Sequence, residues 1–206
     1  MSNTIVHMLR HGHVHNPDRV VYERLPDFHL SEEGSDMANR MSKFIQHHKL
    51  LVDIEHIISS PLDRTIETAR PIVDALKIPL LLDDRLLESK SNFTGMTSTG
   101  VILDVIKNRH LNYVLNPFQP SWGEAYLDIS SRMTSIIEEV KEKYSEQQTL
   151  LVSHQLPIFV ARRTYEKKHL WHNPRRRACA LVSLTSLVFD SVTGDLLKTI
   201  YRTPIS

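Results

Sequence analysis

Short apolar runs alternate with longer segments of helical periodicity along most of the chain. Apolar, branched runs that stop at polar or turn-forming residues are typical of buried strands. The predicted strands are residues 5–9, 54–59, 78–82 and 149–152. The predicted helices are residues 31–48, a segment that opens at 60–63, and residues 123–144 and 156–163. Two further runs, 180–190 and 195–202, flank a turn at 191–194 and predict a β-hairpin.

Two of these helices carry sequence signals for their first turn. Ser31 is a good N-cap, and it is followed by two glutamates, which the helix dipole favours at this end. The order Ser60, Pro61, Leu62, Asp63 predicts an N-cap, a proline at the first helical position and an acid at the third. Arg64 is therefore expected in the first turn of a helix, beside the end of the second strand.

Strands that alternate with helices favour a parallel sheet with helices on both faces. We therefore predict an α/β fold, a three-layer α/β/α sandwich with a mainly parallel sheet and an antiparallel edge strand. The length of 206 residues suits one domain, residues 1–206, better than two. Over residues 89–121 the periodicity weakens and Gly, Asn, Ser and Pro accumulate, so we expect a substrate lid there, in which 101–113 could form a helix.

Composition and charge exclude several classes of protein. The formal net charge is +1, so no global field draws the chain to nucleic acid or to a membrane. Cys179 is the single cysteine, and the N-terminus lacks the features of a secretory signal, so a cytoplasmic location is expected. No apolar run approaches the roughly 20 residues that span a bilayer. The sequence leaves the oligomeric state open, with a homodimer among the alternatives.

The tripeptide Arg10-His11-Gly12 follows directly on the first predicted strand. Open α/β sheets bind ligands at the carboxyl ends of their strands. Arginine offers a fork of donors suited to phosphate, and a neutral imidazole is a nucleophile that can carry a phosphoryl group. This stretch alone would be a weak signal for phosphoryl transfer, because such a tripeptide also arises by chance.

Three later stretches supply the other groups that phosphoryl transfer needs. They are residues 59–69 with Arg64, residues 86–89 with Glu88, and residues 149–154 with His154. The arginines and histidines all fall at strand ends or at a helix start, and several donors are needed to stabilise a transferring phosphoryl group. Taken singly, Arg64 could be a solvated helix residue and His154 a hydrogen-bonded core histidine.

In this order and spacing, the four stretches resemble the histidine phosphatase superfamily, which includes phosphoglycerate mutases and many small phosphatases. The resemblance implies that His11 is the nucleophile, that Arg10 and Arg64 bind the phosphate, and that His154 donates to the phosphoryl oxygens. It also implies that Glu88 is the proton donor. Asn16 resembles the family's phosphate-contacting asparagine, although it lies one position closer to the nucleophile than in many members. Glu124 is a secondary candidate.

Several residues depart from the pattern of many relatives. His13 stands where an acid or glutamine is common, Gln155 replaces a glycine after His154, and the aromatic and glycine pattern beyond Glu88 is reduced to residues 93–95. The resemblance implies a phosphatase that acts on a small phosphorylated metabolite, without a metal or other cofactor. The identity of that metabolite stays open.

Other functions fit the sequence less well. A phosphoglycerate mutase-type phosphotransferase is the main alternative, but such relatives usually carry a longer insertion between the third strand and the last helix. A non-catalytic phosphate-binding module is disfavoured by the intact set of residues. The alternation of His11, His13 and His15 suggests a metal site, but no cysteine cluster or paired carboxylates accompany it. The run Arg175–Arg177 is expected to be a solvated basic loop or an approach route for an anionic substrate.

Overall fold

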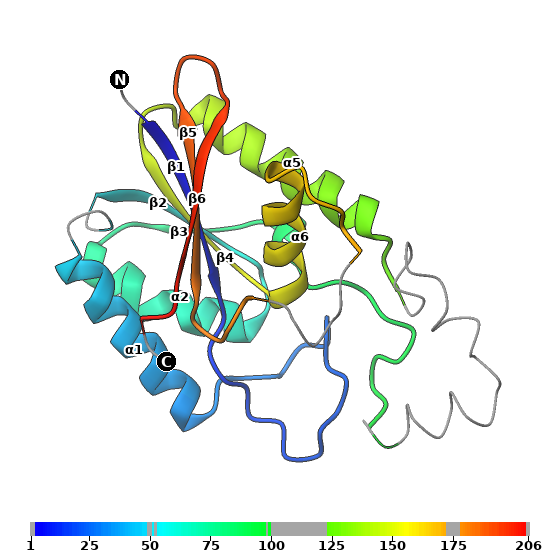
Figure 1. Cartoon of the computed structure of the whole chain (residues 1–206). Coiled ribbons are helices and arrows are strands. Elements are labelled where there is room, and N and C mark those ends of the chain that lie inside the picture. Colours follow the sequence, from blue (N-terminus) through cyan, green and yellow to red (C-terminus); the bar gives the residue numbers. More distant parts are fainter. Residues whose placement is uncertain are drawn as a thin grey trace.

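Six strands form one sheet, and helices cover both of its faces (Figure 1). The computed structural model describes residues 3–48, 51, 53–97, 99, 123–171 and 178–204. The strands are β1 (Asn3–Arg10), β2 (Ile54–Ser59), β3 (Leu80–Leu82), β4 (Gln148–Ser153), β5 (Leu184–Asp190) and β6 (Leu196–Arg202). The helices are α1 (Glu32–His47), α2 (Asp63–Leu76), the short 3-10 helix η1 (Asp84–Leu86), α5 (Tyr126–Lys143) and α6 (Gln155–Tyr165).

The strand order is β3-β2-β4-β1-β5-β6. Neighbouring strands from β3 to β1 run parallel, and β5 runs antiparallel to both β1 and β6. The predicted α/β fold class is therefore confirmed. The place of the antiparallel strand refines the prediction. The strand β5 lies one place inside the edge, and its hairpin partner β6 forms the edge.

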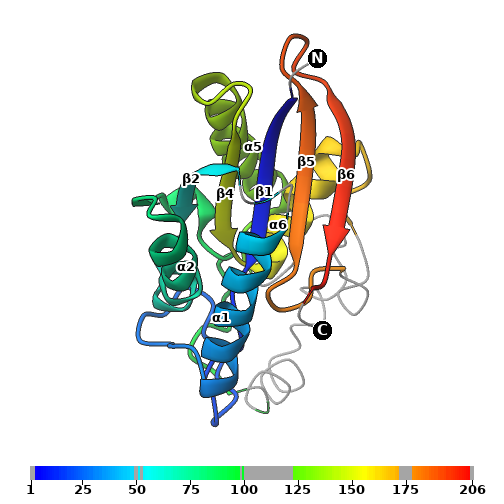
Figure 2. The same cartoon turned by 90° about the vertical axis from the view of Figure 1, so that its left-hand side faces the viewer.

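Each face of the sheet has its own apolar core. Figure 2 shows α1 in front of the sheet, where α1 and α2 cover one face, while α5 and α6 cover the other. Met41 and Ile45 of α1 pack with Ile72 of α2 against the first face. Ile129 and Met133 of α5 belong to the core on the opposite face. Burying such side chains contributes about 1.5–3 kcal/mol each, so the strands that carry the site are anchored from both sides.

The predicted helix starts differ in how well they agree with the structure. Ser31 caps α1 as predicted, because its Oγ accepts from the Gly34 N–H at 3.1 Å. The prediction that Ser60 caps α2 is wrong, since α2 begins at Asp63 and Leu62 precedes it without a side-chain cap. The Ser60 N–H donates to the Val152 carbonyl at 2.9 Å, so Ser60 continues the pairing of β2 with β4. Arg64 still lies in the first turn.

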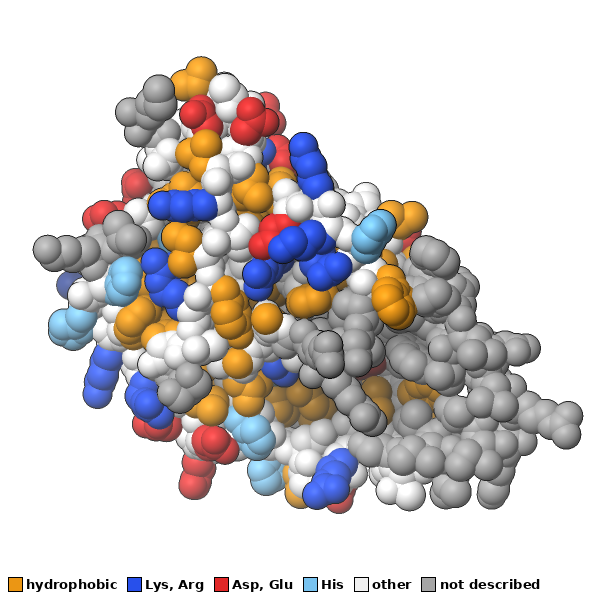
Figure 3. Space-filling model, in the orientation of Figure 1, with side chains coloured by type: hydrophobic (Ala, Val, Ile, Leu, Met, Phe, Trp, Pro, Cys, Tyr) orange, Lys and Arg blue, Asp and Glu red, His pale blue; other side chains and the backbone are white. Residues whose placement is uncertain are grey.

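Several sequence predictions fall outside the described residues. They are most of the expected lid at 89–121, including the helix at 101–113, and the basic run Arg175–Arg177. Among the helices that the structure describes, none is long and apolar enough to cross a membrane. On the face shown in Figure 3, acidic and basic side chains are interspersed.

Candidate active site

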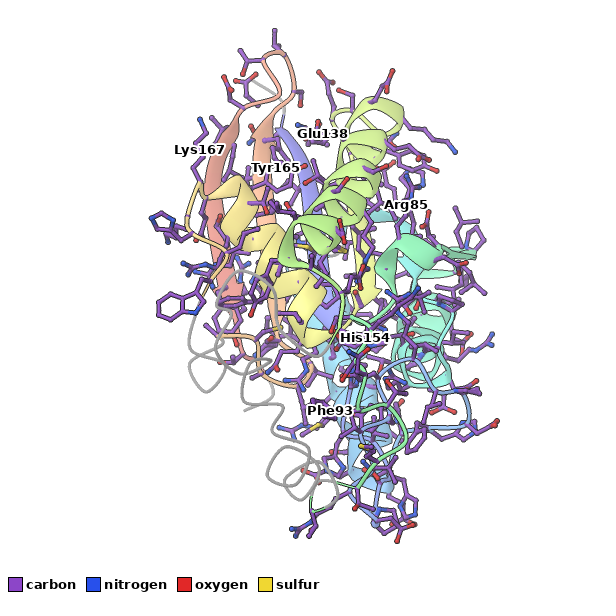
Figure 4. All side chains as sticks on the ribbon, turned by 90° about the vertical axis from the view of Figure 1, so that its right-hand side faces the viewer. Arg85, Phe93, Glu138, His154, Tyr165 and Lys167 are labelled. Atoms are coloured by element: carbon purple, nitrogen blue, oxygen red, sulfur yellow. The ribbon has the colours of Figure 1, made fainter. Side chains whose placement is uncertain are left out.

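The strand register brings the predicted site residues to one edge of the sheet. Arg10 of β1 pairs with Ser153 of β4, and Ser59 of β2 pairs with Val152. The residues that follow these strands, His11, Ser60 and His154, therefore leave the sheet side by side. Figure 4 shows His154 at this end of the sheet, where the chain enters α6.

His11 is buried, with 3% of its surface exposed, and its ring is fixed by its own backbone. Nδ1 lies 2.8 Å from the Gly12 carbonyl oxygen. Because a carbonyl can only accept, Nδ1 carries the proton and the lone pair is on Nε2. Gly12 is required here, since a Cβ would lie 2.7 Å from the Gly34 carbonyl oxygen.

The surroundings of His11 keep its ring neutral. Burial is the largest cause, and the positive charges of Arg64 and Arg10 add to it, so that the pKa of His11 falls to about 3. An imidazole with such a pKa holds no second proton in neutral solution. His11 can therefore present an unprotonated Nε2 to an electrophile.

Arg10 and Arg64 each have a guanidinium nitrogen that is buried and lacks a partner. Arg10 Nη1 donates to the Cys179 carbonyl at 2.7 Å, and Arg64 Nη2 donates to the Glu23 carbonyl. Nε of both arginines has no hydrogen-bond partner within the described part of the protein. Buried donors without partners are rare, so these two nitrogens indicate an anion-binding position.

His154 lies against His11, with ring centroids 5.2 Å apart. Its Nε2 is 2.9 Å from Ser60 Oγ, whereas its buried Nδ1 has no partner among the described residues. Burial holds the pKa of His154 well below its ordinary value, and its interactions with His11 and Arg64 lower this pKa further. If the Ser60 hydroxyl donates to Nε2, the free Nδ1 carries a proton and is a third donor for an anion.

A pocket of about 260 Å³ opens over His11. Its lining residues are Arg10, His11, Val20, Val21, Tyr22, Glu23, Glu88, Ser89, Gln155 and Leu156. We call it the His11 pocket. Glu88 is held at its wall by its own loop, since Oε1 accepts from the Ser89 N–H at 2.8 Å and Arg24 Nε donates to the Glu88 carbonyl at 2.5 Å.

Sequence reasoning missed Glu23, a second carboxyl group in the His11 pocket. Glu23 accepts from Thr94 Oγ1 at 2.9 Å. Burial raises its pKa above the ordinary value and the charge of Glu88 adds to this, although the bond from Thr94 acts in the opposite direction. The sequence reasoning assigned Glu23 no role, because only the fold of the loop after β1 brings it to the pocket.

The structure does not bring Asn16 to the His11 pocket. Its side-chain amide pairs with the backbone of Val20, donating to the carbonyl and accepting from the N–H, both at 2.9 Å. Asn16 therefore closes a turn in the loop and lines a neighbouring hollow. Its expected contact with phosphate stays a prediction.

Glu124 binds two arginines and does not line the His11 pocket. Arg24 Nη2 donates to its Oε2 at 2.8 Å, and Arg132 Nε donates to its Oε1 at 2.7 Å. Arg132 also donates to the Arg85 carbonyl at 2.6 Å. Glu124 thus joins α5 to the loop that carries Glu88, a structural role that leaves it poorly placed to donate a proton.

Potential metal ligands converge elsewhere than at His11. In the described residues, one group of three such side chains lies within 4.8 Å: Asp27, His29 and Asp63. His29 Nδ1 is already 2.5 Å from Glu67 Oε1. His11, His13 and His15 do not form such a group among the described residues.

The chain is similar to known proteins over nearly its whole length. A model of the histidine phosphatase superfamily (branch 1) matches residues 6–200. The uncharacterized protein Rv0525 of Mycobacterium tuberculosis is 40% identical over 205 residues, which cover 98% of each chain. The probable phosphoglycerate mutase GpmB of Escherichia fergusonii is 29% identical, over 74% of this chain and 70% of its own. The solved structure of mycobacterial glucosyl-3-phosphoglycerate phosphatase Rv2419c is similar in fold, with a TM-score of 0.74, 22% identity and coverage of 97% and 96%.

Proposed function

The chain belongs to the histidine phosphatase superfamily, and from this we propose that it hydrolyses small phosphate monoesters through a phosphohistidine on His11. One observation carries the proposal. The buried and neutral ring of His11 has its proton on Nδ1 and its lone pair on Nε2, and it lines a pocket beside unpartnered cationic donors. These are the properties of a nucleophile for phosphoryl transfer.

In the first step, His11 Nε2 attacks the phosphorus atom. The P–N bond forms while the bond from phosphorus to the ester oxygen breaks, and Glu88 gives its proton to the departing oxygen. Arg10, Arg64 and the Nδ1–H of His154 donate to the phosphoryl oxygens, on which negative charge develops. In the second step, water attacks the phosphohistidine, Glu88 takes a proton from this water, and the P–N electron pair returns to Nε2.

These donors support a reaction that needs no metal ion. Two guanidinium groups and an imidazole N–H supply the positive field that a divalent ion would otherwise provide. Release of phosphate from a panel of phosphorylated metabolites, measured with purified protein in the presence of a chelator, tests this. We expect turnover to persist in the chelator. Complete loss that one divalent ion restores would contradict the metal-free mechanism.

His11→Asn tests the nucleophile in the same assay. Asparagine keeps a polar side chain of similar reach but cannot carry a phosphoryl group, so turnover should fall below detection. His47→Asn, at an exposed position on α1, is the matched control and should keep wild-type turnover. Substantial activity in the His11 variant would place the nucleophile elsewhere.

A mutase-type phosphotransferase is the second candidate, and the likeness to a probable phosphoglycerate mutase favours it. A mutase returns the phosphoryl group to a bound acceptor, whereas a phosphatase passes it to water. We expect phosphate release from 3-phosphoglycerate to be faster than movement of label between 3-phosphoglycerate and 2-phosphoglycerate. The reverse order of rates would make the mutase the better assignment. The solved neighbour that is named a phosphatase supports hydrolysis only by analogy of fold.

A further inference from the structure

A second and larger hollow, of about 590 Å³, lies beside the His11 pocket. The loop after β1, drawn in blue at the bottom of Figure 1, forms most of its wall. Its polar lining residues are Arg10, His13, His15, Asn16, Arg19 and Ser31, with Tyr22 among the others. We call it the loop hollow. The proposed chemistry at His11 makes no use of it.

The two cavities share part of their walls. Arg10, Val20 and Tyr22 line both the His11 pocket and the loop hollow. Tyr22 is held between two neighbours, since the Arg64 guanidinium lies 4.8 Å from its ring centroid and the Phe28 ring stacks on it at 4.9 Å. The two cavities therefore adjoin at Tyr22, and a substrate whose phosphate lies at His11 would reach the loop hollow by passing this ring.

The loop hollow offers donors and cationic groups. None of the described residues that line it is acidic. His13 Nδ1 lies 2.8 Å from Ser31 Oγ and 3.9 Å from the exposed carboxylate of Glu33, which leaves its Nε2 for another partner. Arg19 adds a permanent positive charge, and such a lining suits an anion.

The turn that presents Arg19 is well fixed. The Asn16 side-chain amide forms two hydrogen bonds with the Val20 backbone, and the Arg19 N–H donates to the Asn16 carbonyl at 3.2 Å. Arg19 itself has a φ of 52°, in the left-handed region that non-glycine residues seldom occupy. These bonds fix the backbone of the turn, and with it the points from which the side chains of residues 15–19 project.

We propose that the loop hollow binds a second anionic group of the substrate, so that preferred substrates are phosphate monoesters with another phosphate or a carboxylate several bonds from the ester. This inference rests on the proposed function, because the phosphate to be cleaved must lie at His11. The loop hollow begins at the residues it shares with the His11 pocket, Arg10, Val20 and Tyr22, so an anion bound in the hollow must lie several bonds from the ester oxygen. A minimum distance between the two anions follows from this arrangement.

A series of α,ω-alkanediol bisphosphates, compared with ω-hydroxyalkyl monophosphates of the same length, tests the proposal. Binding to the His11→Asn variant, measured by calorimetry, avoids hydrolysis of the ligands. We expect equal affinity at the shortest length and roughly tenfold tighter binding of the bisphosphate beyond a threshold length, the size of effect that one charge-assisted hydrogen bond gives. Alkyl phosphates that end in a carboxylate show which anion the hollow prefers.

Variants of lining residues show whether the tighter binding of the bisphosphate comes from the loop hollow. Arg19→Gln and His15→Gln, each in the His11→Asn background, should reduce the preference for the bisphosphate, and Arg19→Lys should keep most of it. Arg40→Gln removes an exposed arginine of α1 and should leave the preference unchanged. Equal affinity at every length, or a preference that survives both Gln variants, would overturn the second anion site. Failure of the monophosphates and the bisphosphates alike to bind would instead contradict the phosphate site at His11.

Discussion

At the scale of single residues, backbone contacts determine what His11 can do. The Gly12 carbonyl fixes the proton on Nδ1, and burial together with two arginines removes the second proton. Neither Arg10 nor Arg64 needs to touch the imidazole for this effect, because Coulomb interactions are strong where water is excluded. The same arginines thus prepare the nucleophile and offer donors to the phosphate.

Substitution of Ser60 tests whether His154 acts through the tautomer that carries its proton on Nδ1. Ser60→Ala removes the hydroxyl that lies 2.9 Å from His154 Nε2. Without this hydroxyl the proton of His154 is no longer held on Nδ1, so the phosphoryl group loses a donor and kcat/KM should fall roughly tenfold to a hundredfold, which corresponds to about 1–3 kcal/mol. The proton of His154 should also move toward Nε2, which the ¹⁵N chemical shifts of the ring report.

Ser42→Ala is the matched control for this substitution. Ser42 is a buried serine whose Oγ donates to the Pro71 carbonyl at 2.6 Å, between α1 and α2. Its loss should lower stability without changing the tautomer of His154. If the two variants lose activity in proportion to their loss of stability, Ser60 has only a structural role.

The role of Glu88 as proton donor is tested by how the rate of the first step depends on the leaving group. An alkoxide leaves slowly without a proton, whereas p-nitrophenolate leaves well without one. Glu88→Gln should therefore slow the first step by roughly 10²- to 10⁴-fold for alkyl phosphates, and far less for p-nitrophenyl phosphate. Rapid-mixing kinetics with both esters measure this, and Glu142→Gln, at an exposed position on α5, serves as the control. Equal slowing for the two esters would remove Glu88 from the proton transfer.

The sequence predicted the grouping of Arg10, His11 and His154 because strand ends in a parallel sheet share one edge. It could not predict Glu23, whose place depends on the path of a loop that carries no periodicity, because loops take their shape from tertiary contacts. Asn16 illustrates the same limit, since its amide binds the backbone four residues later.

At the scale of elements, an ion-pair network joins the loop of Glu88 to α5. Glu124 binds Arg24 and Arg132, and the side chains of these three residues are 12–25% exposed. Gly123 packs so closely on the Lys90 carbonyl that a Cβ would lie 1.5 Å from its oxygen. These contacts position the segment that follows η1. They connect residues that are far apart in sequence, so no pattern along the chain predicts them.

Glu124→Gln should weaken this connection. Removing the charge leaves two poorly exposed arginines without their partner, so we expect a loss of about 2 kcal/mol, between the values for surface and buried pairs. For a chain of this size, the midpoint of thermal unfolding should fall by about 4–8 °C. Asp36→Asn breaks an exposed ion pair with Arg40 and should change the midpoint of thermal unfolding little. An equal fall of the midpoint in both variants would show that the network does not stabilise the fold.

Periodicity predicted the elements themselves well, but their ends less well. The N-cap of α1 was predicted correctly because Ser31 satisfies a helix amide, a local interaction. The start of α2 was misplaced, since Ser60 bonds to β4 and to His154 in preference to the helix. Tertiary partners decide such cases, and the sequence shows them only indirectly.

At the scale of the whole molecule, buried histidines make folding sensitive to acid. Burial lowers the pKa of His7 to about 4 and that of His11 to about 3, and it lowers the pKa of His154 as well. Each stays neutral in the folded state but takes up a proton below about pH 6.5 when the chain unfolds. Stability is therefore complete above pH 6.5 and is lost as the pH falls toward the folded-state pKa values. His29, whose pKa is raised by its bond to Glu67, acts in the opposite sense.

Urea unfolding between pH 7.5 and pH 5 measures this effect. Each buried histidine removes about 1.4 kcal/mol per pH unit below pH 6.5, so the three together should remove about 4 kcal/mol per unit. His7→Gln should reduce this slope by about a third, because it removes one of the three buried histidines. His7 bonds to Ser186 and Gln148 and lies outside the site, so the substitution leaves the site residues in place. A free energy of unfolding that stays constant from pH 7.5 to pH 5 would contradict the burial of neutral histidines.

The most direct test of the account is to trap the phosphoenzyme. Protein mixed with a ³²P-labelled monoester and quenched within milliseconds should carry label that is stable in base and labile in acid, as a phosphohistidine is. Peptide mapping should place this label on His11, and the His11→Asn variant should carry none. Label on another residue, or phosphate release with no labelled protein under conditions of rapid turnover, would contradict the account.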